Sequence, residues 1–118
     1  MDRFSINFKA ELSKNKDLLN SILSEPKNKK DLFLYASDAA IELVLEIVYL
    51  TYNRTIKSPD SFFQELRDKK KMKYLTNRFN HEKFDILKQE SRRKKIKTLL
   101  FLWPVLPSII SLLKKKQK

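Results

Sequence analysis

Glycine is absent from all 118 residues of this chain. Tight β-hairpin turns need backbone angles with positive φ, which glycine adopts freely and other residues adopt at a cost. Leucine, lysine, glutamate and alanine favour helices, which Pro, Asn, Asp and Ser would connect. We therefore expect an all-α fold, a small helical bundle of modest size around one hydrophobic core.

Hydrophobic periodicity places three helices in the first half of the chain. The spacing predicts a helix over residues 5–24, ended by Pro26, and a short helix over 28–35. Ser37 and Asp38 are typical of a helix N-cap and open the most apolar helix, residues 38–53. Apolar side chains cover this helix except for a narrow stripe of Glu42 and Glu46, which we interpret as solvated. The helix is predicted to form the centre of the core.

The second half is predicted to hold two further helices. Ser58-Pro59-Asp60 is typical of a helix start, and a turn is expected at residues 77–80. The last long helix would run over 81–103, although residues 88–95 include no apolar side chain. We expect that stretch to project from the core as a charged helix or a flexible connector.

Charge divides the chain unevenly. Residues 1–56 hold eight basic and eight acidic side chains, whereas residues 57–118 hold eighteen basic and six acidic ones and account for the net charge of +12. We therefore distinguish a helical core domain, 1–87, from a basic and apolar C-terminal extension, 88–118. Such a basic second half suits nucleic acid or an anionic membrane surface.

Two basic clusters are the strongest functional signal. Lysine and arginine ammonium and guanidinium groups at helical spacing can meet successive phosphates, which gives salt-sensitive binding without sequence preference. A solvated charged surface or a nuclear-import signal would have the same composition. The predicted phosphate contacts are Lys69, Lys70, Lys71, Lys73, Arg92, Arg93, Lys94, Lys95 and Lys97.

An apolar segment, residues 98–113, follows the second cluster and is bent by Pro104 and Pro107. As a straight helix it would span roughly 24 Å at about 1.5 Å per residue, less than the roughly 30 Å hydrocarbon core of a bilayer. A transmembrane span is an alternative that this length disfavours. We favour a bent element that is packed on the helical core, inserted at a membrane interface, or docked in a protein groove. The candidate membrane or partner-docking residues are Leu99, Leu100, Phe101, Trp103, Leu106, Ile109, Ile110, Leu112 and Leu113.

Catalytic chemistry has little support in this sequence. The chain has no cysteine and a single histidine, His81, which lies near a predicted helix start and is interpreted as a capping or surface residue. We therefore predict a non-enzymatic structural protein without cofactor or metal. Its foremost partner would be nucleic acid, with an anionic membrane and a protein partner as alternatives. Residues 1–10 lack the continuous apolar core of a signal peptide, so we expect an intracellular protein of the nucleus or a virion, or one peripheral to a membrane.

Several short elements follow one another in a characteristic order. They are Leu19-x-x-Ile22-Leu23 before Pro26-Lys27, Ala36-Ser37 opening the apolar helix, Ile56 before a lysine-rich helix, Phe84-x-x-Leu87, and a basic run leading to Leu99, Leu100, Pro104, Leu106, Leu112 and Leu113. This order resembles the small basic proteins encoded beside capsid genes in Maverick/Polinton-type elements and adenovirus-related viruses, and distantly the precursor of the adenoviral mu core protein. Such proteins often have glycines where Gln89, Glu90 and Ser91 stand here. The resemblance implies a virion-associated protein that condenses DNA or bridges it to the capsid.

Overall fold

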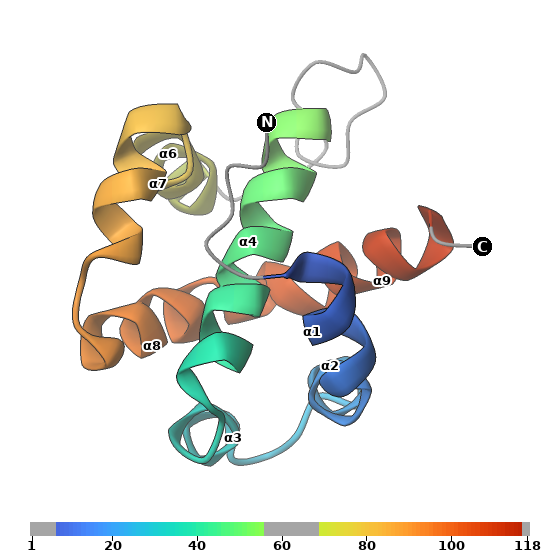
Figure 1. Cartoon of the computed structure of the whole chain (residues 1–118). Helices are drawn as coiled ribbons and strands as arrows, with labels where there is room; N and C mark the ends of the chain where they lie inside the picture. Colours follow the sequence, from blue (N-terminus) through green and yellow to red (C-terminus); the bar gives the residue numbers. More distant parts are fainter. Residues whose placement is uncertain (1–6, 56–68, 117–118) are drawn as a thin grey trace.

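The computed structural model describes residues 7–55 and 69–116, and within these ranges the chain is helical and contains no strand. Figure 1 shows the helix α4 (Asp38–Thr55) in the middle of the molecule, with the other helices around it. Its inward residues belong to one hydrophobic core together with residues from both ends of the chain. The all-α fold with a central apolar helix is therefore confirmed.

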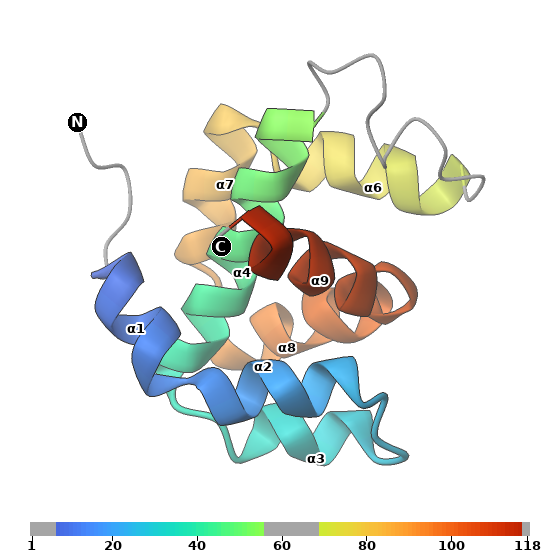
Figure 2. The same ribbon diagram turned by 90° about the vertical axis from the view of Figure 1, so that its right-hand side faces the viewer.

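The N-terminal helix predicted over 5–24 is instead two helices, α1 (Phe8–Lys14) and α2 (Lys16–Leu23). Asn15 separates them, and its side-chain Nδ2 donates a hydrogen bond to the backbone oxygen of Glu11 at 2.9 Å. Asparagine interrupts helices because its side chain competes for backbone hydrogen bonds. The break lets the two helices run in different directions (Figure 2), with α1 packing on α4 and α2 packing on the C-terminal helix α9 (Leu106–Lys116).

The turn after α2 shows how the chain manages without glycine. Glu25 has a φ of 52°, in the left-handed region, and its N–H donates to the carbonyl of Ile22 at 3.1 Å. Glycine usually fills this position after a helix, and another residue there costs on the order of 1 kcal/mol. The next helix, α3 (Lys29–Leu34), begins at Asn28, whose side chain accepts from the Asp31 N–H at 3.2 Å. The short helix predicted over 28–35 is confirmed.

Helix α4 begins where the N-cap signal predicts. The Ser37 hydroxyl accepts a hydrogen bond from the Ala40 N–H at 3.1 Å, which satisfies one of the unpaired donors of the first turn. The prediction of a solvated glutamate stripe on this helix is wrong. Glu46 is fully buried, and Glu42 is only partly exposed. The Glu42 carboxylate forms an ion pair with Lys95 of α8 (Arg92–Phe101).

Two short helices, α6 (Lys69–Arg78) and α7 (His81–Lys88), precede α8. The predicted turn is observed between them at residues 79–80, where the Asn80 side chain accepts from the Lys83 N–H at 3.0 Å. The helix start predicted at Ser58-Pro59-Asp60 lies outside the described residues.

The prediction of one long helix over 81–103 is wrong. The helix is interrupted at residues 89–91, and a new helix, α8, begins after its N-cap residue Ser91. The prediction that residues 88–95 project from the core is also wrong. Helix α8 packs on α4 and α3, with Ile96 and Leu99 buried beneath it. Charge alone does not exclude packing, since carboxylates and carbonyl groups of the neighbouring helices face the charged side chains.

The segment after α8 completes the core. A short 3-10 turn, η1 (Trp103–Val105), redirects the chain into α9, which packs on α4 and α2 (Figure 2). The two prolines of the predicted bend lie in η1 and in the first turn of α9, so the bend is confirmed. Residues on both sides of the compositional boundary at 87/88 contribute to a single hydrophobic core.

Among the described residues, no single helix is long and apolar enough to cross a bilayer. The helices Arg92–Phe101 and Trp103–Lys114, bent by 57° relative to each other, have the length and composition of a membrane span only when taken together.

Candidate nucleic-acid interface

Helices α6 and α8 concentrate positive charge in the folded molecule. Each contains five basic residues and no acidic residue. Figure 1 and Figure 2 both show α8 lying between α6 on one side and α3 on the other. The two basic clusters, which are separated by about twenty residues in the sequence, therefore belong to neighbouring helices.

Direct contacts join α6 to the end of α8. The Tyr74 hydroxyl donates to Thr98 Oγ1 at 3.2 Å, and the Tyr74 ring lies 4.5 Å from the Phe101 ring. The ammonium group of Lys71 sits 3.4 Å from the centroid of the Phe101 ring, a cation–π contact. These contacts place the lysine cluster of α6 beside the α8 cations.

Not every predicted phosphate contact lies on the surface. Arg92 Nη2 donates to the carbonyl oxygens of Phe33 at 3.1 Å and Leu34 at 3.0 Å, and also to that of Ala36. Lys95 Nζ lies 3.3 Å from Glu42 Oε1, and the lysine side chain is only 13% exposed. Arg92 and Lys95 are three residues apart and therefore share the face of α8 that packs on α3 and α4.

The other α8 cations lie on the surface of the protein. Arg93, Lys94 and Lys97 are exposed, and none of them forms an ion pair within the described part of the chain. Lys94 lies one turn before Thr98 and so faces α6, whereas Arg93 and Lys97 face α3. On α6, Lys69, Lys70 and Lys73 are exposed and Lys71 is partly buried against Phe101.

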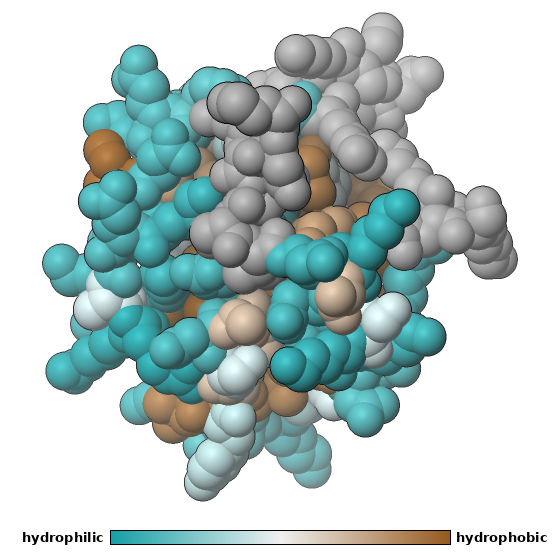
Figure 3. Space-filling model, viewed as in Figure 1, coloured by the Kyte–Doolittle hydropathy of each residue, from teal (hydrophilic) through white to brown (hydrophobic). Residues whose placement is uncertain are grey.

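A groove of about 680 Å³ runs between α3 and α8. The groove is lined by three apolar side chains, Leu34, Ile96 and Leu100. The cationic side chains that line it are Lys30, Arg92, Arg93 and Lys97. Figure 3 shows hydrophilic side chains over most of this side of the molecule, with a small hydrophobic patch at the lower edge, where α3 and α8 lie. We call this the α3–α8 groove.

Sequence reasoning missed Lys30 as a member of this surface. Lys30 belongs to the first half of the chain, where basic and acidic residues balance. The only signal for it was the Lys29-Lys30 pair at the start of a short helix. We define the basic face as the α3 lysine that lines the groove, the exposed cations of α6 and α8, and the lysine on Phe101: Lys30, Lys69, Lys70, Lys71, Lys73, Arg93, Lys94 and Lys97.

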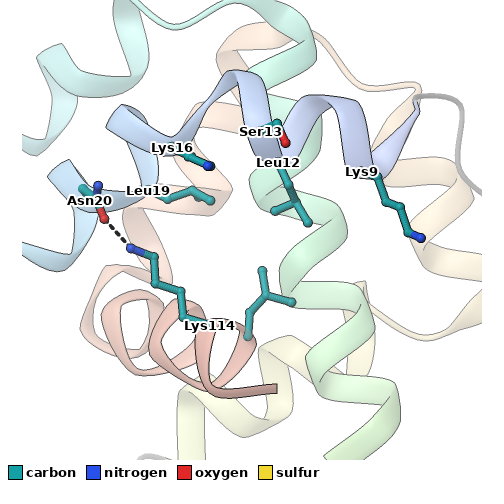
Figure 4. Close-up of a pocket in the computed structure, with 8 residues that line it drawn as sticks. Lys9, Leu12, Ser13, Lys16, Leu19, Asn20 and Lys114 are labelled. Atoms are coloured by element: carbon teal, nitrogen blue, oxygen red, sulfur yellow. Dashed lines mark hydrogen bonds between the residues drawn. The ribbon is translucent and has the colours of Figure 1, made fainter. Parts of the chain in front are cut away.

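A second cleft lies on another part of the molecule, between α1, α2 and α9 (Figure 4). It has a volume of about 720 Å³ and includes Lys9, Lys16 and Lys114. These lysines do not converge, because Lys9 points away from the other two and Lys114 donates to the side chain of Asn20. The cleft therefore does not gather its positive charges around one anion.

The predicted docking residues of the apolar segment lie mostly inside the protein. Trp103 is 5% exposed, and its ring meets the Phe33 ring edge-on at 5.8 Å. Leu100 and Leu112 are partly buried, and Phe101 is 38% exposed. Buried in the core are Leu99, Trp103, Leu106, Ile109, Ile110 and Leu113. Of the alternatives drawn from the sequence, packing on the helical core is the one that this structure adopts.

His81 and Glu42, two titratable side chains that the sequence singles out, both have partners within the fold. His81 begins α7, and its Nδ1 lies 3.0 Å from the hydroxyl of the buried Tyr49. The carboxylate of Glu42 meets Lys95. Among the described residues, no three histidine, aspartate or glutamate side chains are grouped so as to hold a metal ion.

Protein-family models, curated proteins and solved structures were each compared with the chain, and none of them matches.

Proposed function

We propose that this protein is a non-enzymatic nucleic-acid-binding protein that uses its basic face to contact phosphates without sequence preference. The observation that carries this proposal is the packing of α6 beside α8, each with five basic residues and no carboxylate, joined where Lys71 meets Phe101. The face combines cations from three helices that are separate in the sequence. A polyanion with regularly spaced charges is the ligand that such a surface suits.

Protein stability does not explain the positions of Arg93 and Lys94. Arg92, Arg93, Lys94 and Lys95 all lie in the first turn of α8, where the helix dipole disfavours positive charge. Two of the four find carboxylate or carbonyl partners in the fold, but Arg93 and Lys94 do not do so within the described residues. Each unpartnered cation there costs about 0.3–1 kcal/mol. A phosphate bound at this helix end would carry negative charge, which both the cations and the positive end of the helix dipole attract.

The resemblance to virion-associated basic proteins supplies a biological setting for the proposal. In that setting the protein would neutralise packaged DNA or bridge it to a capsid, within an infected cell's nucleus or a virion. Phosphate contacts without base readout are sufficient for such a role, because packaging must accept any sequence.

An anionic membrane surface is the second candidate. Together, the bent helix pair Arg92–Phe101 and Trp103–Lys114 has the length and composition of a membrane span, which favours this candidate. Anionic lipid headgroups would also attract the same cations. The apolar side chains of that pair, however, face α4 and α2 in the structure. Insertion into a bilayer would therefore require the core to open, whereas nucleic-acid binding uses side chains that are already exposed.

Fluorescence anisotropy with a labelled oligonucleotide tests the proposal. If about four phosphates are neutralised, raising salt from roughly 50 to 200 mM should weaken binding about 50-fold for a single strand and about 150-fold for a duplex. Absence of binding to both oligonucleotides at the lower salt concentration would contradict the proposal.

A further inference from the structure

The charged side chains of the α3–α8 groove all have the same sign. They come from both helices and are cationic, and none of the described residues that line the groove is acidic. Between them Leu34 is 46% exposed, and Leu100 is partly buried. An apolar side chain that entered the groove would remove these leucines from water, and carboxylates beside it would meet cations. The groove therefore suits a surface that presents an apolar side chain next to acidic ones.

Helix α7 of the same protein presents such a surface. Ile86 is 58% exposed, the largest exposed fraction among the large aliphatic side chains that the structure describes. Glu82 lies one turn before it and Asp85 directly before it, and both are exposed. These three residues share one side of the helix, which we call the α7 stripe. At 3.6 residues per turn, the α7 lysines, Lys83 and Lys88, fall on other sides of the helix.

The α7 stripe and the α3–α8 groove are complementary in charge and in spacing. Arg93 and Lys97 of the groove are one turn apart on α8. Glu82 and Asp85 of the stripe are three residues apart on α7. Residues at these spacings have Cβ atoms about 5–6 Å apart, so two carboxylates can meet two cations at the same time. The ion pairs would fix the register of the contact, and burial of Ile86 would supply most of its affinity.

The stripe and the groove belong to different parts of the molecule. Figure 1 and Figure 2 both show α7 in the upper half of the molecule and α3 at its lower edge. No residue of α7 lines the groove. The match is therefore one between two copies of the chain. Because the two surfaces differ, a pair of copies has an unoccupied groove at one end and an unoccupied stripe at the other.

We infer that this protein self-associates head to tail, with the α7 stripe of one copy docked in the α3–α8 groove of the next. Ile86 packs on Leu34, and the acidic side chains of the stripe face the groove cations. Contacts of this kind build open chains of copies, or rings where the rotation closes. The inference does not depend on the proposed function, and the basic residues of α6 take no part in the contact, because they do not line the groove.

Sedimentation equilibrium of the full-length protein, without nucleic acid, tests the inference. The average mass should rise past that of a dimer between about 10 μM and 1 mM protein, because a contact of this size is weak. Ile86→Ala and Leu34→Ala each shorten one of the two meeting side chains and should weaken association about tenfold or more. Tyr35→Ala is the matched control, because Tyr35 is 88% exposed beside Leu34 but does not line the groove. This variant should associate as the wild-type protein does, and circular dichroism should show all three variants folded.

Mixing two of the variants tests the head-to-tail arrangement. The Ile86→Ala protein keeps an intact groove and the Leu34→Ala protein keeps an intact stripe, so one contact of wild-type strength forms between them. The mixture should therefore give heterodimers and no longer assemblies, at concentrations where each variant alone is monomeric.

Several outcomes overturn the inference. One is a wild-type protein that stays monomeric up to about 1 mM. Another is a wild-type mass that levels off at the dimer, because a two-fold symmetric contact closes there. Association that neither substitution weakens, or that Tyr35→Ala weakens equally, places the contact elsewhere. A mixture that associates no more than either variant alone excludes the pairing of stripe with groove. Because nucleic acid is absent from these samples, each result leaves the proposed function to its own test.

Discussion

Arg92 Nη1 donates a hydrogen bond to Asp38 Oδ1 at 2.7 Å, which ties the start of α8 to the start of α4. The same guanidinium donates to the carbonyls of Phe33, Leu34 and Ala36, at the end of α3. Carbonyl groups at a helix C-terminus have no partner within the helix and carry the negative end of its dipole. Arg92 therefore holds three helices together with a charge that the sequence alone assigns to phosphate binding.

We predict that Arg92→Gln lowers the free energy of unfolding by about 1–3 kcal/mol, because several carbonyls lose a charged donor. Arg93→Gln is the matched control, since it removes the same charge from the adjacent, exposed position and should change stability by no more than about 0.5 kcal/mol. Urea denaturation followed by circular dichroism measures both values. Similar values for the two variants would show that the Arg92 contacts contribute little.

The burial of α9 predicts a large effect of shortening its side chains. Ile109 is fully buried, so Ile109→Ala should destabilise the protein by about 2–5 kcal/mol through lost contacts and the cavity left behind. Ile86→Ala makes the same chemical change at a position that is 58% exposed and should cost less than about 1 kcal/mol. Urea unfolding curves for the pair provide the comparison. If α9 were detached from the core in solution, Ile109→Ala would be as mild as Ile86→Ala.

Removing charge from the basic face should weaken nucleic-acid binding and its salt dependence. In the double variant Arg93→Gln/Lys97→Gln, two phosphate contacts are lost, so the slope of log affinity against log salt for a single strand should become shallower by about 1.4. The control Lys9→Gln/Lys16→Gln lowers the net charge equally at the cleft between α1 and α9. Anisotropy titrations at several salt concentrations give the slopes. An equal change in both variants would mean that net charge, and not this face, governs binding.

Trp103 is the only tryptophan and can report whether the apolar segment leaves the core. Because it is 5% exposed and packed on Phe33, we expect its fluorescence to be unaffected by vesicles containing anionic lipid, even if surface lysines adsorb to them. Lipids with brominated acyl chains provide the measurement, since bromine quenches only a tryptophan that enters the bilayer. Strong quenching would support the membrane alternative and would mean that α8 and α9 open away from α4.

Local features of the sequence determine most of the helices. The absence of glycine and the apolar periodicity predict an all-α fold, and the polar residues before the helices locate several starts. Ser37 and Asn28 illustrate this, because an N-cap needs only the side chain of one residue and the backbone of the next few. The apolar surface of the helix predicted over 38–53 similarly requires burial wherever the rest of the chain lies.

Only the tertiary structure decides which charges are available for binding. Arg92 and Arg93 are adjacent in the sequence and chemically identical, yet one holds the end of α3 and the other remains exposed. The partners of Arg92 are mainly backbone carbonyls, about sixty residues away, and a carbonyl leaves no signal in a sequence. Lys30 joins the basic face for a related reason, because α3 packs on α8. Composition determines the amount of charge, whereas packing between distant helices determines where it acts.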